Sequence, residues 1–518
     1  MAKPEIETSE NLKLVCEIIE RIFLDWLCRE MSIVVDSIGY DEPLFRLGID
    51  SLGAVSIAAE LEVEFEKTVN PEVLYELDTI LELAEYLLST PKKAGRARGS
   101  SASSTGAAVS GSQLQVNTNV EDEQDPSSHF ARLNRKVNTL KQQGIYPFEP
   151  EISSHDGAWV QCENRRMLML ASYEYLGLLG HEELRNAANS AVQKFGTGHH
   201  GSRLLTGTTS LHCELESRLA GWMCAEDAIV FSSGYVANLA TISALVGPGD
   251  FVVGDKLNHA SIVDGCRMSG AEFSVFAHND MDELASVLLK QDGRRTLVVV
   301  DAIFSMEGDI VDLPVVVDIC KKNNALLMVD EAHSMGVLGT TGSGIQEHFG
   351  LDPGDIDVKM GTLSKSLAGS GGFVASNKEI VTYLRHHARG YIFSGALPAV
   401  YAQVALAALD VLKREPARVG RIWKNLEYYL VGLRKLGFDT GACETPIVPI
   451  MTQSNEMTIE FSSLCREAGL LVAPVCFPAV PMDAPRLRTC ITECHEQAEL
   501  DFALETLERA GRQCGVIA

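Results

Sequence analysis

Two stretches of this 518-residue sequence place a chemically useful side chain in unusual surroundings. In VKMGTLSKSLAGSGGF, residues 358–373, Lys365 lies among small residues, where burial of a charged amine is costly unless the amine serves a purpose. In LFRLGIDSLGAVS, residues 44–56, Ser51 lies at the predicted start of a helix. A serine there is usually only a helix cap, and a lone buried lysine usually forms a structural ion pair. The neighbouring residues must therefore show whether either side chain has a chemical role.

The neighbours of Lys365 suit a lysine that forms a Schiff base beside a phosphate group. Thr362 and Ser364 supply hydroxyls, and glycines follow the lysine. Asp330 lies near the end of the apolar run ALLMVDEAH, where its carboxylate could keep a pyridine nitrogen protonated, and His333 could reach a ring hydroxyl. This combination is consistent with pyridoxal phosphate, PLP.

Two further motifs supply the remaining contacts of such a site. His259, in DKLNHASIVDG, offers a flat ring that could stack on the pyridine. Gly234 and Tyr235, in FSSGYVAN, lie at a predicted strand-to-helix turn, whose backbone amides could bind the phosphate. The four motifs together predict a PLP site.

Apolar, strand-like runs and helical stretches alternate around these motifs. The predicted strands are 227–233, 250–255, 296–304 and 325–333, and a helix is predicted near 312–323. This alternation predicts a parallel sheet with helices on both faces, and such sheets bind ligands beyond the carboxyl ends of their strands. About the last hundred residues mix helices and short strands, which predicts a smaller second lobe.

The N-terminal part of the sequence predicts a separate, small all-α bundle of four helices. Apolar residues recur at helical spacing over 9–35, 51–66 and 79–88. Residues 91–128 are rich in Ser, Gly, Ala and Thr and poor in large apolar residues, which predicts a disordered, flexible linker. The predicted domains are therefore 1–90 and 129–518, joined by the linker 91–128.

Composition limits the partners of the chain. The formal net charge of −26 makes nucleic acid and anionic membranes poor partners. Residues 1–90 contain 20 acidic and 6 basic residues, and this acidic surface suggests docking onto basic patches of other proteins. There is no apolar run of about eighteen residues that could span a membrane, and the polar N-terminus does not resemble a signal peptide. Scattered cysteines without C-x-x-C favour reduced thiols in a cytoplasmic protein.

Three local matches to other motifs fail in their context. GTGHHG, residues 196–201, has the spacing of a dinucleotide-binding loop, but a helical pattern over 183–195 precedes it where a strand is required. DEAH resembles a helicase box, but no phosphate-binding G-x-x-x-x-G-K-[ST] is present. His199 and His200 are adjacent, which is poor spacing for one metal ion, so no metal site is predicted.

Residues 10–90 resemble an acyl carrier domain. The matching segments are LFRLGIDSLGAVSIAAELE and DTILELAEYL, in which Asp50, Ser51 and Leu52 form the DSL sequence of carriers. The resemblance implies that Ser51 receives 4′-phosphopantetheine from a phosphopantetheinyl transferase, and that another enzyme loads the acyl group. A carrier presents a thioester and does no chemistry itself.

Residues 129–518 resemble the α-oxoamine synthase family of fold type I PLP-dependent transferases. This family includes 2-amino-3-ketobutyrate CoA ligase, 8-amino-7-oxononanoate synthase, 5-aminolevulinate synthase and serine palmitoyltransferase. The resemblance implies an α/β fold with a mostly parallel seven-stranded sheet, a smaller α+β C-terminal lobe, and a homodimer with the site at its interface. The matching segments occur in the family's order: YEYLGL, GSRLLTG, FSSGYVAN, NHASIVDG, DAIFSMEGD, DEAHSMG, GTLSKSLAGSGG, FSGALPA and RLRTCITECHE.

Carried onto this sequence, the resemblance makes Lys365 both the Schiff-base lysine and the acid/base. Asp330 would pair with the ring nitrogen and His333 with the ring oxygen, while His259 would stack on the ring. Arg488 would bind the carboxylate of the amino acid, a pairing that suits the guanidinium fork. The other implied cofactor contacts are Ser305, Thr362, Gly234 and Tyr235, joined by Ser394 and Gly395 from the partner subunit.

The implied reaction joins an amino acid to an acyl thioester, with loss of carbon dioxide, to give an α-aminoketone. Because a carrier is on the same chain, the acyl group is predicted to arrive on Ser51. The alternatives are free acyl-CoA, as in a sphingoid-base synthase or the ketobutyrate ligase, and serine plus a malonyl carrier, as in prodigiosin-type pathways. A catalytically inactive carrier scaffold is the non-enzymatic alternative. Glu174, where the family often has Asn, could alter substrate choice or be neutralised locally.

Overall fold

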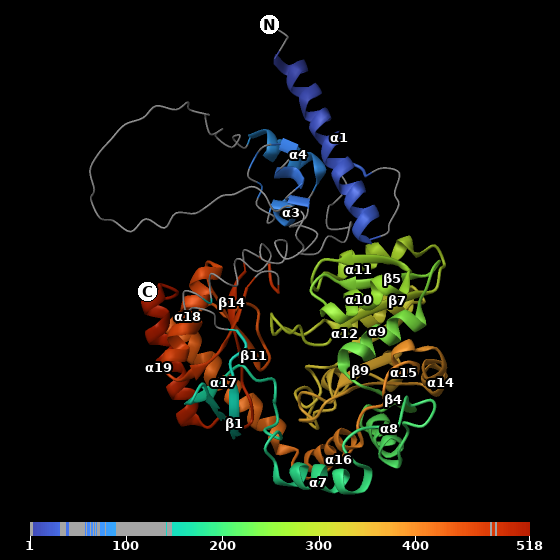
Figure 1. Ribbon diagram of the computed structural model, residues 1–518, viewed down its shortest axis with the longest axis vertical. Coiled ribbons are helices and arrows are strands. Elements are labelled where there is room, and N and C mark those ends of the chain that lie inside the picture. The colour runs from blue at the N-terminus through green and yellow to red at the C-terminus, as the bar shows by residue number, and fades with distance from the viewer. Residues whose placement is uncertain are drawn as a thin grey trace, which may run out of the picture. The chain divides into compact units, whose positions relative to one another are not determined.

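The computed structural model contains two compact units, Met1–Gln142 and Gln143–Ala518 (Figure 1). Ser51, the predicted linker 91–128 and much of the predicted helix 51–66 lie outside the residues that the structure describes, and the predicted domain boundaries remain predictions. The described residues are 148–518 except 477–478 and 482–483, and, in the first unit, 4–31, 38–40, 73–77, 79–89, 141 and scattered positions between 57 and 69.

The first unit is mainly helical in its described residues. The structure has α1 (Pro4–Met31), α3 (Val73–Glu76) and α4 (Ile80–Ser89), so the helices predicted over 9–35 and 79–88 are confirmed. Apolar residues recur every three or four positions on one face of α1 and of α4, and these two faces form a common core. This core includes Ile19, Phe23, Trp26, Leu83 and Leu87.

A seven-stranded sheet forms the centre of the second unit. Its strands are β4 (Asp227–Phe231), β5 (Phe251–Asp255), β6 (Glu272–Phe276), β7 (Thr296–Asp301), β8 (Leu326–Asp330), β9 (Val358–Thr362) and β10 (Gly372–Ser376). They lie in the order β4-β10-β9-β8-β7-β5-β6. Strands β5 to β9 pair in parallel, whereas β10 is antiparallel to both of its neighbours. The predicted strands correspond to β4, β5, β7 and β8, and the mostly parallel seven-stranded sheet is confirmed.

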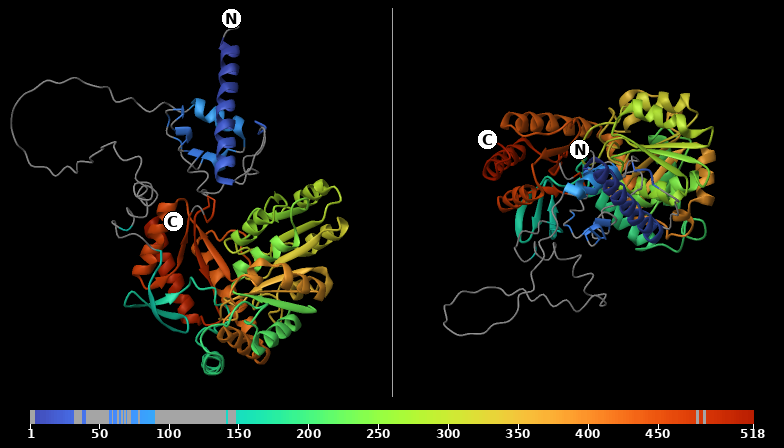
Figure 2. Two further views of the ribbon diagram at one scale, coloured as in Figure 1. Left: turned by 45° about the vertical axis from the view of Figure 1, so that its right-hand side comes forward. Right: turned by 90° about the horizontal axis from the view of Figure 1, so that it is seen from above.

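Helices cover both faces of this sheet (Figures 1 and 2). Alternate strand residues point to opposite faces, so Val298 and Val300 of β7 join one core cluster while Leu297 and Val299 join the other. The central strands are therefore buried on both faces, which explains their continuous apolar sequence. The first cluster contains residues of α8 (Ser210–Trp222), α11 (Met281–Leu288), α12 (Leu313–Lys322) and α16 (Ala399–Arg414), and the second contains residues of α9 (Gly234–Leu245), α10 (Ala260–Ser269) and α14 (Lys378–His387).

A smaller lobe is built from both ends of the second unit, and not from the last hundred residues alone. One sheet has the order β11-β14-β13, and the other has the order β1-β2-β3-β12, in which β12 pairs in parallel with β3. Figure 1 shows β1 beside the helices of the C-terminal part. The strands are β1 (Ile152–Asp156), β2 (Trp159–Cys162), β3 (Arg165–Met169), β11 (Ile447–Met451), β12 (Leu470–Leu471), β13 (Ala473–Val475) and β14 (Arg486–Cys490), and the helices are α17 (Ala417–Leu436), α18 (Asn455–Glu467) and α19 (Gln497–Cys514).

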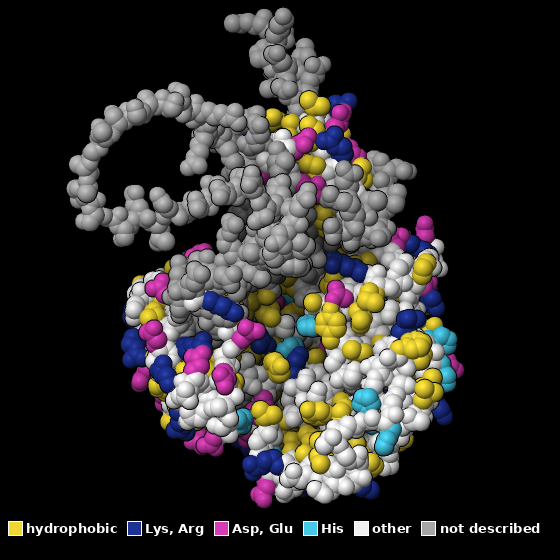
Figure 3. Space-filling model, in the orientation of Figure 1, with side chains coloured by type: hydrophobic (Ala, Val, Ile, Leu, Met, Phe, Trp, Pro, Cys, Tyr) yellow, Lys and Arg dark blue, Asp and Glu magenta, His cyan; other side chains and the backbone are white. Residues whose placement is uncertain are grey.

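The remaining elements connect these layers. The predicted helix over 183–195 is α7 (Glu182–Phe195), which packs against α16. Shorter helices are α13 (Ile345–Phe349), α15 (Arg389–Ile392), and the 3-10 turns η2 (Leu289–Gln291) and η3 (Pro353–Asp355). On the face seen in Figure 3, charged side chains of both signs lie around the periphery of the second unit, while hydrophobic and His side chains gather around a central hollow.

The described residues contain neither a candidate membrane-spanning helix nor a candidate metal-binding cluster. No helix in these ranges combines the length and apolar character of a membrane span. The same ranges contain no group of three or more His, Cys, Asp and Glu side chains arranged to hold a metal ion.

Candidate active site

The carboxyl ends of β8 and β9 bring several predicted site residues to one edge of the sheet. Asp330 is the last residue of β8 and Thr362 the last residue of β9. Because these two strands are parallel neighbours, their carboxyl ends meet. His333 follows β8 by three residues and Lys365 follows β9 by three residues, so both belong to loops at this edge.

A chain of hydrogen bonds joins Asp330 to His259. The amide nitrogen Nδ2 of Asn238 donates to Asp330 Oδ2 over 2.7 Å and to Ser261 Oγ over 2.9 Å. Ser261 Oγ in turn lies 2.7 Å from His259 Nδ1. His259 caps the N-terminus of α10 and remains exposed at the edge of the sheet. The buried amide of Asn238 therefore fixes the carboxylate and, through Ser261, the imidazole.

Sequence reasoning missed Asn238 and Ser261. The sequence does indicate that both residues lie near the site. Asn238 follows Gly234 by four residues on the same helix face, and Ser261 follows His259 by two residues at a helix start. Asn238 Oδ1 is buried and has no hydrogen-bond partner among the described residues, so this side chain still has an acceptor to offer.

Burial changes the pKa values of Lys365 and of Asp301. It lowers the pKa of the Lys365 amine to about 8, although the Asp330 carboxylate opposes this shift. Burial also holds the pKa of Asp301 well above its ordinary value, and the charge of Asp330 adds to that effect. Asp301 Oδ2 accepts a 2.7 Å hydrogen bond from the backbone N–H of His259. An amine with a pKa near 8 is partly neutral at neutral pH, as a nucleophile or base must be.

His333 is held by a tyrosine of the YEYLGL motif. Its Nδ1 shares a 2.6 Å hydrogen bond with the hydroxyl of Tyr175, which is fully buried. Burial holds the pKa of His333 well below its ordinary value, and the positive charges of Lys365 and Arg488 act in the same direction. The ring is therefore neutral near pH 7, and it is oriented by Tyr175, which the sequence predictions did not include.

A glycine at the start of α9 leaves room beside Thr362. A Cβ atom built on Gly234 would lie 3.2 Å from Thr362 Oγ1, so a side chain there would fill the space. Ser233 caps α9, and its Oγ accepts a hydrogen bond from the N–H of Val236. Tyr235 is partly exposed and donates to Asp264. The amides of a helix start suit an anion such as a phosphate group.

The smaller lobe contributes Arg488, the middle residue of β14. Its Nε donates to the carbonyl oxygen of Ser305 over 2.6 Å, which joins two residues predicted for the same site. Arg486 binds the same loop, because its Nη1 lies 3.0 Å from both Met306 O and Glu307 Oε1. These contacts hold the loop after β7 against β14.

Ser394 and Gly395 lie elsewhere on the chain, after α15. Ser394 is half-buried and Gly395 is exposed, and Gly395 approaches the ring of His199. No contact in the described ranges joins these two residues to Thr362 or Lys365. Their predicted role, as contributions from a partner subunit, stays a prediction.

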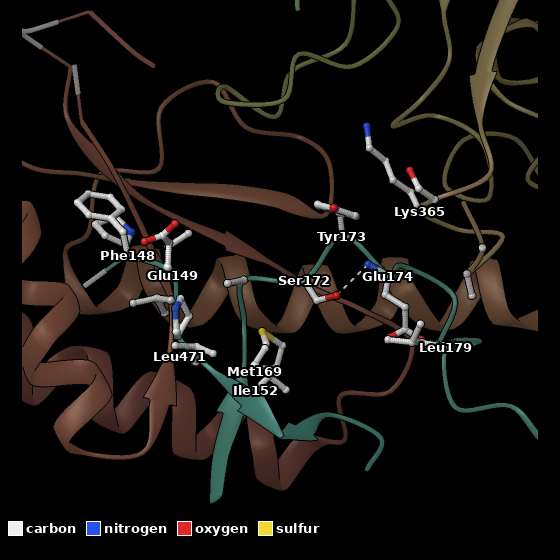
Figure 4. A pocket seen from close by; sticks show the side chains of 18 residues that line it. Phe148, Glu149, Ile152, Met169, Ser172, Tyr173, Glu174, Leu179, Lys365 and Leu471 are labelled. Atoms are coloured by element: carbon white, nitrogen blue, oxygen red, sulfur yellow. Dashed lines mark hydrogen bonds between the residues drawn. The ribbon is translucent and has the colours of Figure 1, made fainter. Parts of the chain in front are cut away.

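An apolar cavity of about 530 Å³ lies beside Lys365 (Figure 4). Figure 4 shows Lys365 and Tyr173 near one end of it, and Phe148 and Leu471 near the other. This volume lies within the range of small-molecule binding sites. The other lining residues include Ile152, Met169, Ala171, Glu174, Leu179, Ala368, Val472 and Pro474.

Comparisons with known proteins agree with this geometry. Residues 165–507 match the family described as aminotransferase class I and II, and residues 21–87 match the phosphopantetheine attachment site. The 8-amino-7-oxononanoate synthase of Thermosipho melanesiensis is 42% identical over 384 residues, which cover 74% of this chain and 98% of that protein. The serine palmitoyltransferase of Sphingobacterium spiritivorum is 40% identical over 75% of this chain and 96% of that protein.

The chain belongs to the α-oxoamine synthase family. A solved structure of Sphingomonas wittichii serine palmitoyltransferase superimposes with a TM-score of 0.74, at 33% identity, and covers 76% of this chain and all of that one. A second solved serine palmitoyltransferase, with PLP present, is 35% identical with the same TM-score. This α-oxoamine synthase is therefore an acyltransferase whose cofactors are PLP and 4′-phosphopantetheine.

The residues present fit PLP. The exposed ring of His259 offers a stacking face, and Gly234 leaves space for a phosphate at the start of α9. Asp330 places a buried carboxylate that Asn238 orients. In the described ranges the Lys365 amine makes no hydrogen bond, and it lies 5.9 Å from the centroid of the Tyr173 ring. These residues therefore offer a ring for stacking, a carboxylate, space for an anion at a helix start, and an amine without a hydrogen bond in the described ranges.

Glu174 places a buried carboxylate in the wall of the cavity of this α-oxoamine synthase. Its side chain is 9% exposed, and Oε1 accepts a 2.8 Å hydrogen bond from the backbone N–H of Leu179. Burial raises the pKa of Glu174 to about 7, with a further increase from Glu493 and opposing effects from the Leu179 hydrogen bond and Arg418. The neighbouring Arg418 donates to Glu493 over 2.8 Å and does not form an ion pair with Glu174.

Replacing Glu174 with glutamine is expected to increase stability more at pH 8 than at pH 5. The folded-state pKa of about 7 lies above the ordinary 4.5, so the cost of ionising this buried carboxyl develops as the pH rises through that interval. Glutamine keeps an acceptor for the backbone N–H of Leu179, and it removes the cost of ionisation because its side chain does not titrate. The free energy of unfolding should rise by up to about 3 kcal/mol at pH 8 and by much less at pH 5.

Melting temperatures of both proteins at the two pH values check this. Glu149→Gln is the matched control, because Glu149 lines the same cavity but is exposed. An equal change in Tm at both pH values would contradict the expected titration of Glu174.

Proposed function

We propose that this enzyme condenses an amino acid with an acyl thioester carried on the phosphopantetheine of its own Ser51. A bond forms between the Cα atom of the amino acid and the acyl carbon, and the acyl C–S bond breaks to release the carrier thiol. The carboxyl group leaves as carbon dioxide, and a proton takes its place on Cα. The product is an α-aminoketone.

The observation that supports delivery by the carrier is the presence of a carrier domain and a transferase domain on one chain. A phosphopantetheine attachment site matches residues 21–87 and the transferase matches residues 165–507. Linking a carrier to its enzyme makes the encounter intramolecular, with an effective concentration of about millimolar for a flexible tether. We place the carrier domain at 1–90, the linker at 91–128 and the synthase domain at 129–518.

We assign the following roles to the side chains, and the geometry supports them. When bound, PLP supplies an electron sink for charge that develops at Cα. The buried carboxylate of Asp330, oriented by Asn238, holds a proton on the pyridine nitrogen. The amine of Lys365, with its pKa lowered to about 8, takes the proton from Cα and later returns one. His259 covers one ring face.

Arg488 binds the carboxylate of the amino acid. Its Nε donates to the carbonyl oxygen of Ser305, and a side-chain hydrogen bond joins the guanidinium group to Tyr175, so we assign the remaining N–H donors to the carboxylate. We assign the phosphate to Gly234, Tyr235 and Thr362, and the ring oxygen to His333, which Tyr175 orients.

We further propose a homodimer in which Ser394 and Gly395 of the partner subunit complete the phosphate site. Phe393, directly before them, is 75% exposed, and Leu205 of the GSRLLTG motif is 80% exposed. We infer that the second subunit covers these two side chains. The other proposed partners are a phosphopantetheinyl transferase and an enzyme that loads the acyl group.

Replacing Ser51 with alanine tests delivery by the carrier. The holo protein is loaded with an acyl group and the aminoketone formed is measured with each of several amino acids. Ser51→Ala should lower the rate of carrier-dependent turnover at least a hundredfold, because the intramolecular thioester is lost. Ser56→Ala, in the same segment, is the control and should retain the wild-type rate. If Ser51→Ala equals the wild type when both are supplied with acyl-CoA, and loading gives no gain, free acyl-CoA is the substrate.

A further inference from the structure

The cavity beside Lys365 carries an unusual distribution of charge. Its lining is mostly apolar, and the acidic side chains among its described residues are Glu149 and Glu174. The only cation among the same lining residues is Lys365, which the cofactor engages. A carboxylate that entered the cavity would therefore find no unoccupied positive partner among the described residues.

Glu174 is the acidic residue placed to act on a bound group. Glu149 is exposed, so water screens its charge, whereas Glu174 is buried in the wall near Lys365. Figure 4 shows Glu174 beside Ser172 and Leu179, on the same side of the cavity as Lys365. A charge is screened far less in such a position than at the surface.

The charges behind Glu174 do not cancel it. Arg418 lies on the far side, on α17, and its guanidinium donates to Glu493, to Glu415 and to the carbonyl oxygen of Leu176. Glu493 is a second carboxylate, and it also pairs with Arg421. Glu174 itself has one hydrogen-bond donor to its carboxylate in the described structure, the N–H of Leu179. The carboxylate of this cavity-lining residue therefore has no ion-pair partner in the described structure.

We propose that the cavity accepts an uncharged aliphatic acyl chain, and that Glu174 selects against acyl groups that end in a carboxylate. A terminal carboxylate would lose its hydration in an apolar space without a cation, and it would face the like charge of Glu174. An aliphatic chain meets neither cost and buries apolar surface. The inference rests on the proposed condensation of an acyl thioester and names the class of acyl group. It favours a fatty acyl substrate over a malonyl group.

The test compares two thioesters that differ only at the far end of the chain. The octanoyl and mono-suberoyl thioesters of N-acetylcysteamine are supplied to the PLP-loaded full-length protein at pH 8, where Glu174 with its pKa of about 7 is mostly ionised, and kcat/KM is measured for each. These small thioesters bypass Ser51, so a failure of carrier delivery does not affect the comparison. Affinities of the corresponding unreactive thioethers, measured by calorimetry, report the same discrimination without turnover.

The wild type should prefer the octanoyl thioester at least tenfold. Glu174→Gln should lower that preference at least tenfold, mainly through better use of the suberoyl thioester, while Glu149→Gln should leave it within twofold. The melting temperature of Glu174→Gln, compared with that of the wild type, shows whether the fold is intact. A wild type that accepts both thioesters equally would overturn the proposal, and so would a preference that Glu174→Gln does not alter.

Discussion

Replacing Lys365 with alanine is expected to lower kcat about ten-thousandfold. We assign the proton transfer at the Cα atom of the amino acid to the amine of Lys365, and general acid–base catalysis contributes up to about 10⁴-fold. Burial lowers its pKa to about 8, so part of the population is neutral and ready to accept a proton near pH 8. The effect should appear in kcat more than in KM, because the variant keeps Arg488, to which we assign the carboxylate of the substrate.

The control for this variant is the other buried lysine of the same strand region. Lys359, in β9, donates to the carbonyl oxygens of Met223 over 2.9 Å and of Pro353 over 3.3 Å. Lys359→Met should therefore lower stability and leave kcat per folded molecule near the wild-type value. The measurement is steady-state formation of aminoketone, with the visible absorption of the cofactor recorded for each protein. A Lys365→Ala protein that keeps a tenth of the wild-type kcat would exclude this lysine as the acid/base.

Replacing Glu216 with alanine is expected to lower the free energy of unfolding by about 3–5 kcal/mol, because it leaves a buried guanidinium unpaired. Arg203 and Glu216 are 6% and 5% exposed, and two parallel hydrogen bonds of 2.8 and 3.0 Å join them. Glu216 Oε1 also accepts from the N–H of Val230 in β4, and Arg385 lies 3.4 Å from Oε2. The carboxylate thus links α8, the edge strand and α14.

Urea unfolding of the full-length protein measures this change. The matched control is the exposed pair Arg512–Glu508, also 3.0 Å apart, where Glu508→Ala should cost less than about 1 kcal/mol. Replacing both buried partners, as Arg203→Met with Glu216→Leu, should recover much of the loss, because no unpaired charge remains. Equal losses in the free energy of unfolding for Glu216→Ala and Glu508→Ala would show that the buried pair stabilises the fold no more than the exposed pair does.

The central sheet could be predicted from the sequence because its strands are buried on both faces. Runs such as LVVV within TLVVVD are continuously apolar and rich in β-branched residues, as is typical of strands buried on both faces. The positions of Asp330 and Thr362 at strand ends follow directly from those runs. The smaller lobe was predicted incompletely, because β12 contributes two residues and pairs with β3 from the other end of the unit. No local pattern indicates such a pairing.

The site residues that the sequence predictions omitted act through other residues. Asn238 and Tyr175 orient Asp330 and His333, and their roles depend on distances between segments far apart in the chain. The state of Glu174 was left open for the same reason. Only the positions of Arg418 and Glu493 show that this carboxylate is not neutralised by an ion pair.

The attachment of the loop after β7 to β14 has a consequence for synthesis of the protein on the ribosome. Every residue assigned to the cofactor within one subunit, from Gly234 to Lys365, emerges before β14, and Arg486 and Arg488 emerge afterwards. A nascent chain can therefore expose all of these assigned cofactor residues while Arg488, which we assign to the amino acid, is still inside the ribosome. The contacts of β14 with Ser305 and Glu307 form last.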